Sequence, residues 1–134
     1  MLTHAQIPTV HWLPWAGWNL RRNPFGELTP DQRADVAVVD VAAITRWLTG
    51  TRPAMQLIGD CGRGKTTRLL KLMKHLPEAS YVCLPEDGPC PPIAAGRPLL
   101  IDEAQRMPRA AWQRVFSTGL PLVLATHRDM SRLL

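Results

Sequence analysis

The sequence contains no apolar run approaching the length of a membrane-spanning helix, which is about 20 residues. Its N-terminus lacks the basic start and continuous apolar stretch of a secretory signal, and its 3 cysteines are too widely spaced for a zinc-site pattern. Internal repeats and a compositional boundary between domains are also absent. We therefore expect one domain over residues 1–134, no membrane partner, and a cytoplasmic location in which unpaired thiols stay reduced.

Acidic residues are fewer than basic ones, which gives a net charge of +5. The apolar content of 46% and the charged content of 20% are those of an ordinary globular protein. One stretch, Cys61–Leu76, contains no acid and five basic residues, namely Arg63, Lys65, Arg68, Lys71 and Lys74. This cluster has two interpretations: a surface for DNA, or a solvated helix face beside an anion site. The second needs no macromolecular partner.

Glycine and lysine combine in one stretch in a phosphate-binding pattern. Residues 59–66 read G-x-x-x-x-G-K-T, the P-loop or Walker A pattern, between an apolar run at 54–58 and a helical pattern at 66–76. Glycines allow the tight turn, the loop amides form an anion nest, and the helix dipole favours negative charge. Lys65 is expected to reach the β- and γ-phosphates, and Thr66 to bind Mg²⁺. We expect nucleotide to be bound by Gly59, Asp60, Cys61, Gly62, Arg63, Gly64, Lys65, Thr66 and Thr67.

A second motif follows from Leu99 to Glu103, where an apolar strand ends in two carboxylates, as in a Walker B segment. The carboxyl ends of parallel strands border the crevice in which open α/β sheets bind ligands. We expect Asp102 to hold Mg²⁺ through water and Glu103 to orient and deprotonate the attacking water. A third apolar strand, Pro121–Ala125, ends at Thr126 and His127, which we expect to contact the γ-phosphate.

The remaining segments predict the following local structure. Thr29, Pro30 and Gln32 form the capping box of a short helix, and Asp40 caps a second helix over Val41–Thr49 that stops at Gly50. Further segments are a small strand at Val36–Val39, a buried strand at Ser80–Leu84, a long proline-rich loop at Pro85–Pro98, a helix over Ala104–Thr118 broken at Pro108, and a helix or fraying tail at Asp129–Leu134.

With these motifs placed, the chain resembles P-loop ATPases of the AAA+ and additional-strand class. Leu122–Arg128 looks like the sensor-1 strand of that class, with His127 where the family usually has Asn. Leu20–Phe25 is similar to the L-x-x-N-P-F segment of bacterial secretion-accessory and transposition-helper ATPases, which lies near the adenine. The resemblance implies a three-layer α/β fold with a mostly parallel sheet of order 5-1-4-3-2. Here we expect a minimal core of about four strands, without the fifth strand and without the C-terminal lid.

The resemblance and the motifs together predict an Mg-ATP-binding domain with slow hydrolysis, in which Glu103 and Lys65 are the catalytic residues and the cofactors are ATP and Mg²⁺. A nucleotide-dependent switch with negligible turnover, triggered by a protein partner or DNA, is the alternative. A small-molecule kinase is disfavoured because the Asp102-Glu103 pair suits water activation. An arginine finger from a second copy or a partner has three candidates, Arg106, Arg109 and Arg114. Residues 29–134 form the expected core, and residues 1–28 a tryptophan-rich arm that packs onto it or docks a partner.

Overall fold

A computed structural model of the chain describes residues 26–49 and 54–134. In this part the fold is α/β, with four strands that form one sheet of order β1-β4-β3-β2 in which all neighbours are parallel. The strands are β1 (Ala54–Ile58), β2 (Ser80–Cys83), β3 (Leu99–Asp102) and β4 (Leu122–Thr126). The helices are α1 (Pro30–Val36), α2 (Val41–Leu48), α3 (Lys65–His75), the 3₁₀ helix η2 (Ala104–Arg106) and α4 (Arg109–Ser117). The α/β class, the parallel sheet and its four strands were all expected from the sequence.

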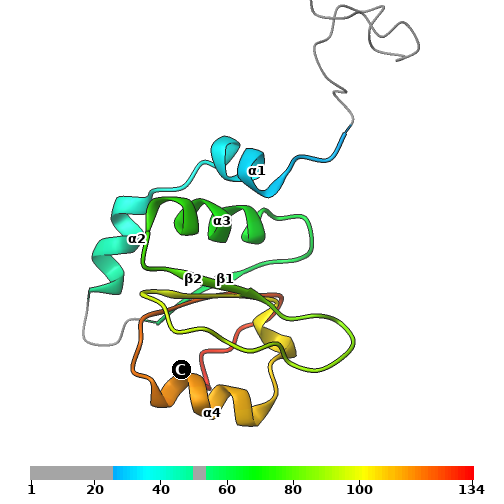
Figure 1. Cartoon of the computed structure of the whole chain (residues 1–134), viewed down its shortest axis with the longest axis vertical. Coiled ribbons are helices and arrows are strands. Elements are labelled where there is room, and N and C mark those ends of the chain that lie inside the picture. Colours follow the sequence, from blue (N-terminus) through cyan, green and yellow to red (C-terminus); the bar gives the residue numbers. More distant parts are fainter. Residues whose placement is uncertain (1–25, 50–53) are drawn as a thin grey trace, which may run out of the picture.

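The helices lie on both faces of the sheet. Figure 1 shows α1, α2 and α3 on one side of the strands and α4 on the other. Successive side chains of a strand point to opposite faces, so Leu122 and Leu124 of β4 join the cluster on the α4 side, while Val123 joins the cluster on the α3 side. Both faces of the central strands β3 and β4 are therefore covered, and every residue of these two strands is buried. A parallel sheet covered on both faces requires apolar runs of this kind.

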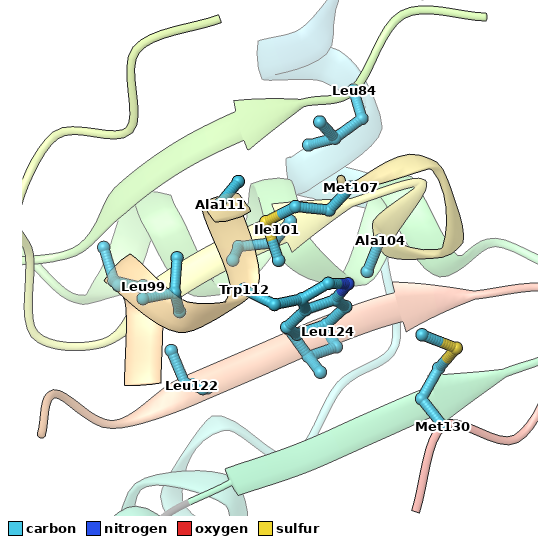
Figure 2. Packing of buried hydrophobic residues seen from close by; sticks show 11 residues of the cluster. Leu84, Leu99, Ile101, Ala104, Met107, Ala111, Trp112, Leu122, Leu124 and Met130 are labelled. Carbon is cyan, nitrogen blue, oxygen red and sulfur yellow. The ribbon is translucent and has the colours of Figure 1, made fainter. Parts of the chain in front are cut away.

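The cluster on the α4 side is built around an aromatic residue. Figure 2 shows Trp112 of α4 among side chains of β3 and β4, with Met130 of the C-terminal segment at its border. Trp112 also stacks on Phe116 with ring centroids 5.4 Å apart. This packing holds η2 and α4 against the sheet, and it thereby positions the turn between β3 and η2.

The crossover from β2 to β3 contains no helix. Residues 85–98 run as a loop, as the sequence predicts, and the loop is anchored where Gly96 passes Ser80. A Cβ at position 96 would come within 2.4 Å of the Ser80 backbone nitrogen, so only glycine fits this approach. The Ser80 hydroxyl also donates to the Ala94 carbonyl at 2.8 Å. The loop is therefore held to the start of β2.

Two helix starts have the predicted caps. Thr29 and Gln32 make both bonds of the capping box at α1, with Pro30 in its first turn. Asp40 Oδ1 accepts a hydrogen bond from the Ala43 amide at 2.8 Å and so caps α2. The predicted helical span 104–118 is also divided as expected, since Pro108 separates η2 from α4.

Loss of the α2 cap gives a first expected result. Asp40→Ala leaves the Ala43 amide without its acceptor, and caps of this kind contribute about 1 kcal/mol, so the variant should unfold at a lower temperature than the wild type. Asp40→Asn keeps an acceptor oxygen at the same place and should unfold close to the wild-type temperature. Thermal unfolding followed by circular dichroism measures both variants. Equal midpoints for Asp40→Ala and the wild type would show that the cap does not stabilise the fold.

Two local predictions are wrong. Val36–Val39 is not a strand: Val36 ends α1, the next three residues have no regular structure, and Val38 is 96% exposed. No strand in the described part of the chain lies beside it to supply a ladder. The helix expected at Asp129–Leu134 is absent, and Ser131–Leu133 form a turn instead. Gln56 of β1 bonds Asp129 and the Met130 amide at 3.0 and 2.8 Å, which ties this segment to the sheet as a turn.

Some predictions fall outside the described residues. The tryptophan-rich arm lies there except for Gly26–Leu28, which are exposed and without helix or strand. The segment Leu20–Phe25 and the helix stop at Gly50 also lie there. Across residues 26–49 and 54–134, we find no helix that combines the length and the apolar character needed to cross a membrane.

Candidate functional site

The predicted phosphate loop connects β1 to α3 with a backbone that depends on glycine. Gly62 and Gly64 have φ values of 78° and 76°, in the left-handed region that side chains disfavour. A Cβ at either position would meet no atom within 4 Å, so the requirement is conformational rather than spatial. Gly64 is the N-cap of α3 and offers no side-chain cap. The first amides of α3 therefore have neither an intrahelical acceptor nor a cap, which suits them to an anion.

Lys65 is folded back into this loop. Its side chain is buried, with the residue only 6% exposed, and Nζ donates to the carbonyl oxygens of Gly59 and Asp60 at 2.6 and 2.8 Å. A buried ammonium needs such partners. The two carbonyls hold the charge at the mouth of the loop, where a phosphate oxygen could accept from the same nitrogen.

The two predicted Mg²⁺ ligands meet directly, although they are far apart in the sequence. Thr66 Oγ1, in the first turn of α3, donates to Asp102 Oδ2 at 2.6 Å. Asp102 is 1% exposed, and its second oxygen accepts the Glu103 amide at 3.0 Å. The parallel pairing of β1 and β3 with β4 brings the carboxyl ends of these strands to one edge, and this contact follows from that arrangement.

Tyr81 of β2 completes the surroundings of Asp102 and was not among the site residues predicted from the sequence. Its hydroxyl donates to Asp102 Oδ2 at 3.1 Å. Burial raises the pKa of Tyr81 well above its ordinary value and the Asp102 carboxylate raises it further, so this hydroxyl stays protonated and remains a donor. The sequence offered one signal, because Tyr81 is the single tyrosine of the chain and lies in the strand that pairs with β3. Its contact with Asp102, however, depends on the register of these two strands.

Glu103 lies at the turn after β3 in a left-handed backbone conformation, with φ of 55°. Its carboxylate accepts from Gln105 Nε2 at 2.6 Å, and His127 Nε2 lies 3.1 Å from both of its oxygens. Arg106 Nη2 is 3.7 Å from Oε2. Burial would raise the pKa of Glu103, but the hydrogen bonds from His127 and Gln105 and the electrostatic effects of His127 and Arg106 hold that pKa below its ordinary value.

The two predicted residues at the tip of β4 behave differently. His127 reaches Glu103, and its backbone amide donates to Gln105 Oε1 at 3.3 Å. The Thr126 hydroxyl is completely buried and donates to the Arg128 carbonyl at 3.0 Å, so it shapes the turn after the strand. Of the two, it is the His127 side chain that lies beside Glu103. Gln105 is a further residue of the site that was not predicted from the sequence.

The rest of the predicted set lies around this centre. Asp60, Cys61 and Arg63 are exposed on the loop, and Thr67 is half-buried in the first turn of α3. Arg106, the first arginine-finger candidate, is held within the chain by the Leu84 carbonyl at 3.2 Å and by its approach to Glu103. Arg109 and Arg114 are exposed on α4. The basic cluster on α3 is partly neutralised, because Lys74 forms ion pairs with Asp31 and Asp35 of α1 at 3.3 and 2.6 Å.

The donor set fits Mg²⁺ bound together with a polyphosphate. Within the described residues no three His, Cys, Asp or Glu side chains form a metal-binding group. Mg²⁺ at phosphate sites takes only one or two protein oxygens and completes its shell with phosphate and water. The adjoining oxygens of Thr66 and Asp102 meet that requirement, and the uncapped amides of α3 face the same edge.

An apolar groove lies away from this chemistry. About 520 Å³ of space opens between residues 90–95 and α4, lined by apolar side chains such as Ile93, Leu99 and Val115 and by one charged residue, Arg114. Of the residues of the two motifs only Leu99 lines this groove, and Lys65, Thr66, Asp102 and Glu103 do not, so it is not the phosphate site. Comparisons with protein-family models, with curated proteins and with solved structures found no match to the chain.

Proposed function

We propose that this chain is a P-loop domain that binds Mg-ATP and hydrolyses it slowly. The observation that carries the proposal is the 2.6 Å contact between Thr66 of the first motif and Asp102 of the second. Two motifs recognised separately in the sequence converge on one pair of oxygens beside a buried lysine. A glycine-rich turn with no nucleotide role would not require this convergence.

The residues divide the work as follows. Lys65 donates to phosphate oxygens and neutralises charge, and the first amides of α3 orient the phosphates. Thr66 and Asp102 offer oxygens to the metal, and Tyr81 keeps the Asp102 carboxylate in place through its hydrogen bond. Glu103 accepts the proton of the attacking water. When bound, Mg-ATP supplies the electrophilic phosphorus and a cation that draws charge from it, so the chain contributes mainly positioning and electrostatic stabilisation.

The strand order supports membership of the additional-strand class of P-loop proteins. In that class a further strand separates the Walker A strand from the Walker B strand, and here β4 lies between β1 and β3. We place the protein in the cytoplasm, and we propose that a partner protein or a second copy supplies an arginine finger to the site. Arg109 and Arg114 are better finger candidates than Arg106, because Arg106 is already engaged within its own chain. The ion pairs of Lys74 weaken the case for DNA as a partner, because they neutralise part of the basic cluster.

The test is a pair of measurements on the purified chain. Titration calorimetry with ATP and Mg²⁺ should give saturable binding, and a coupled assay should detect free phosphate. Absence of binding at millimolar Mg-ATP would overturn the proposal. The engagement of Glu103 by His127 and Gln105 favours the switch as a second function, and binding without phosphate release would select it. A phosphorylated product in place of free phosphate would indicate a kinase.

Loss of the Thr66 hydroxyl should separate metal binding from phosphate binding. Thr66→Ala removes one of the two adjoining oxygens, so the affinity for ATP in the presence of Mg²⁺ should fall about tenfold or more, while affinity in EDTA should change little. Thr66→Ser retains the hydroxyl and serves as the matched control. An equal loss with and without Mg²⁺ would show that Thr66 does not act through the metal.

A further inference from the structure

Glu103, Gln105 and His127 form a closed ring of contacts at the edge of the site. Gln105 Nε2 donates to the Glu103 carboxylate, Gln105 Oε1 accepts the His127 amide, and the His127 ring returns to the Glu103 carboxylate. Both ends of the Gln105 amide are therefore used. The ring joins η2 to the tip of β4, and neither of these elements belongs to the Walker A or the Walker B motif.

The backbone at Glu103 indicates that the ring holds a defined position. A non-glycine residue in the left-handed region is strained and persists where its surroundings over-determine its backbone conformation. Here the surroundings are the buried end of β3 on one side and the ring on the other. The Glu103 side chain is 20% exposed, so it lies within reach of water but is not free in it.

The distribution of donors shows what the ring does to the carboxylate. Gln105 Nε2 donates to Oε2 at 2.6 Å, and Arg106 Nη2 lies 3.7 Å from the same oxygen. His127 Nε2 lies 3.1 Å from both Oε2 and Oε1. A carboxylate oxygen that accepts several donors is a poorer acceptor for a proton from water, because the donors stabilise its ionised form. Glu86 of the long loop, 3.9 Å from Arg106, adds a weak outer contact.

We propose that Gln105 and His127 are positioning residues that hold Glu103 in a resting orientation, and that hydrolysis proceeds when they release it. The inference rests on the proposed function, since Glu103 acts on water only at an ATP site. One contact connects the ring to the phosphate loop: the Gly59 amide donates to the Thr126 carbonyl at 3.1 Å, one residue before His127. A shift of the loop around bound phosphate acts on the tip of β4 through this bond.

The test uses Gln105→Leu, which retains the side-chain volume and removes both amide contacts, with Gln113→Leu on the exposed face of α4 as the matched control. We expect kcat for ATP hydrolysis to rise about three- to tenfold in Gln105→Leu, with the Kd for Mg-ATP within twofold of the wild type and Gln113→Leu unchanged in both. If Gln105→Leu does not fold, Gln105→Ser removes the same reach with a smaller side chain. If the wild type binds Mg-ATP without turnover, the same comparison applies, and Gln105→Leu should then gain turnover.

A second readout does not depend on activity. The His127 imidazole resonances, assigned through their loss in His127→Asn, should shift in nucleotide-free Gln105→Leu and Glu103→Gln and stay in place in Gln113→Leu. Adding Mg²⁺ with a non-hydrolysable ATP analogue to the wild type should move them towards the Glu103→Gln position. Intact binding with equal or lower kcat in Gln105→Leu, or His127 resonances that the analogue leaves in place, overturns this inference alone. Failure of the wild type to bind Mg-ATP overturns the proposed function, and this inference falls with it.

Discussion

Lys65→Ala is expected to abolish measurable binding of ATP. The lysine is the one buried cation of the phosphate loop, and truncating one partner of a buried charge pair costs about 2–5 kcal/mol, which lowers affinity by a factor of roughly 30 to several thousand. An affinity in the micromolar range would thereby move to millimolar or beyond. Titration calorimetry with ATP and Mg²⁺ measures the loss directly.

The matched control for this variant is Lys71→Ala, which removes a cation further along the same helix. If the basic cluster attracted nucleotide only through its summed charge, both variants would lose affinity alike. If Lys65 acts as a specific ligand, the affinity for ATP should fall strongly in Lys65→Ala and change within about twofold in Lys71→Ala at physiological salt, where the Debye length is about 8 Å. Equal losses of affinity in the two variants would show that ATP binds a diffuse electrostatic surface and not a specific site at Lys65.

Folding has to be measured beside binding in Lys65→Ala. The ammonium satisfies the carbonyls of Gly59 and Asp60, and an unsatisfied buried acceptor costs about 1–3 kcal/mol unless water replaces the donor. A lower unfolding temperature is therefore part of the expected result, and binding is to be measured well below it. A variant that unfolds like the wild type and still binds ATP within threefold of it would overturn the role of Lys65.

The parts of the fold that the sequence predicts are those with local causes. The caps at Thr29 and Asp40 are bonds between residues three apart, and the glycine-rich turn at Gly62 and Gly64 depends on backbone conformation alone. The strand before this turn, β1, and the strand that carries the second motif, β3, follow from short apolar runs. These signals suffice to place Lys65, Thr66, Asp102 and Glu103 at one edge of a parallel sheet.

The residues that the sequence did not reveal depend on distant contacts. Tyr81 reaches Asp102 because β2 pairs beside β3, and Gln105 reaches His127 because η2 packs against the end of β4. Neither residue carries a local pattern, so only the assembled sheet selects it. The false strand at Val36–Val39 shows the converse: β-branched residues favour a strand only where a neighbouring strand can pair with them, and Val38 stays in solvent.

Glu103→Gln should leave ATP binding intact and stop turnover. The amide has nearly the same shape as the carboxylate and can still accept from Gln105 Nε2, but it cannot take a proton from water. General-base groups contribute about 10²–10⁴-fold, so phosphate release should fall by that factor. The Kd should stay within a few-fold of the wild type, because the side chain of Glu103 contacts neither the loop nor the Thr66–Asp102 pair. Glu78→Gln, an exposed carboxylate before β2, is the control and should hydrolyse ATP like the wild type.

Combining Glu103→Gln with Gln105→Leu decides between two explanations of any gain in the single Gln105 variant. If Gln105 acts only through Glu103, the double variant should be as inactive as Glu103→Gln, and the effects will be strongly non-additive. If loss of Gln105 instead opens the site to water or loosens the tip of β4, the double variant should keep part of the gain. Equal phosphate release by Glu103→Gln and the wild type would remove Glu103 from the chemistry, and the water would then need a base other than the carboxylate at the end of β3.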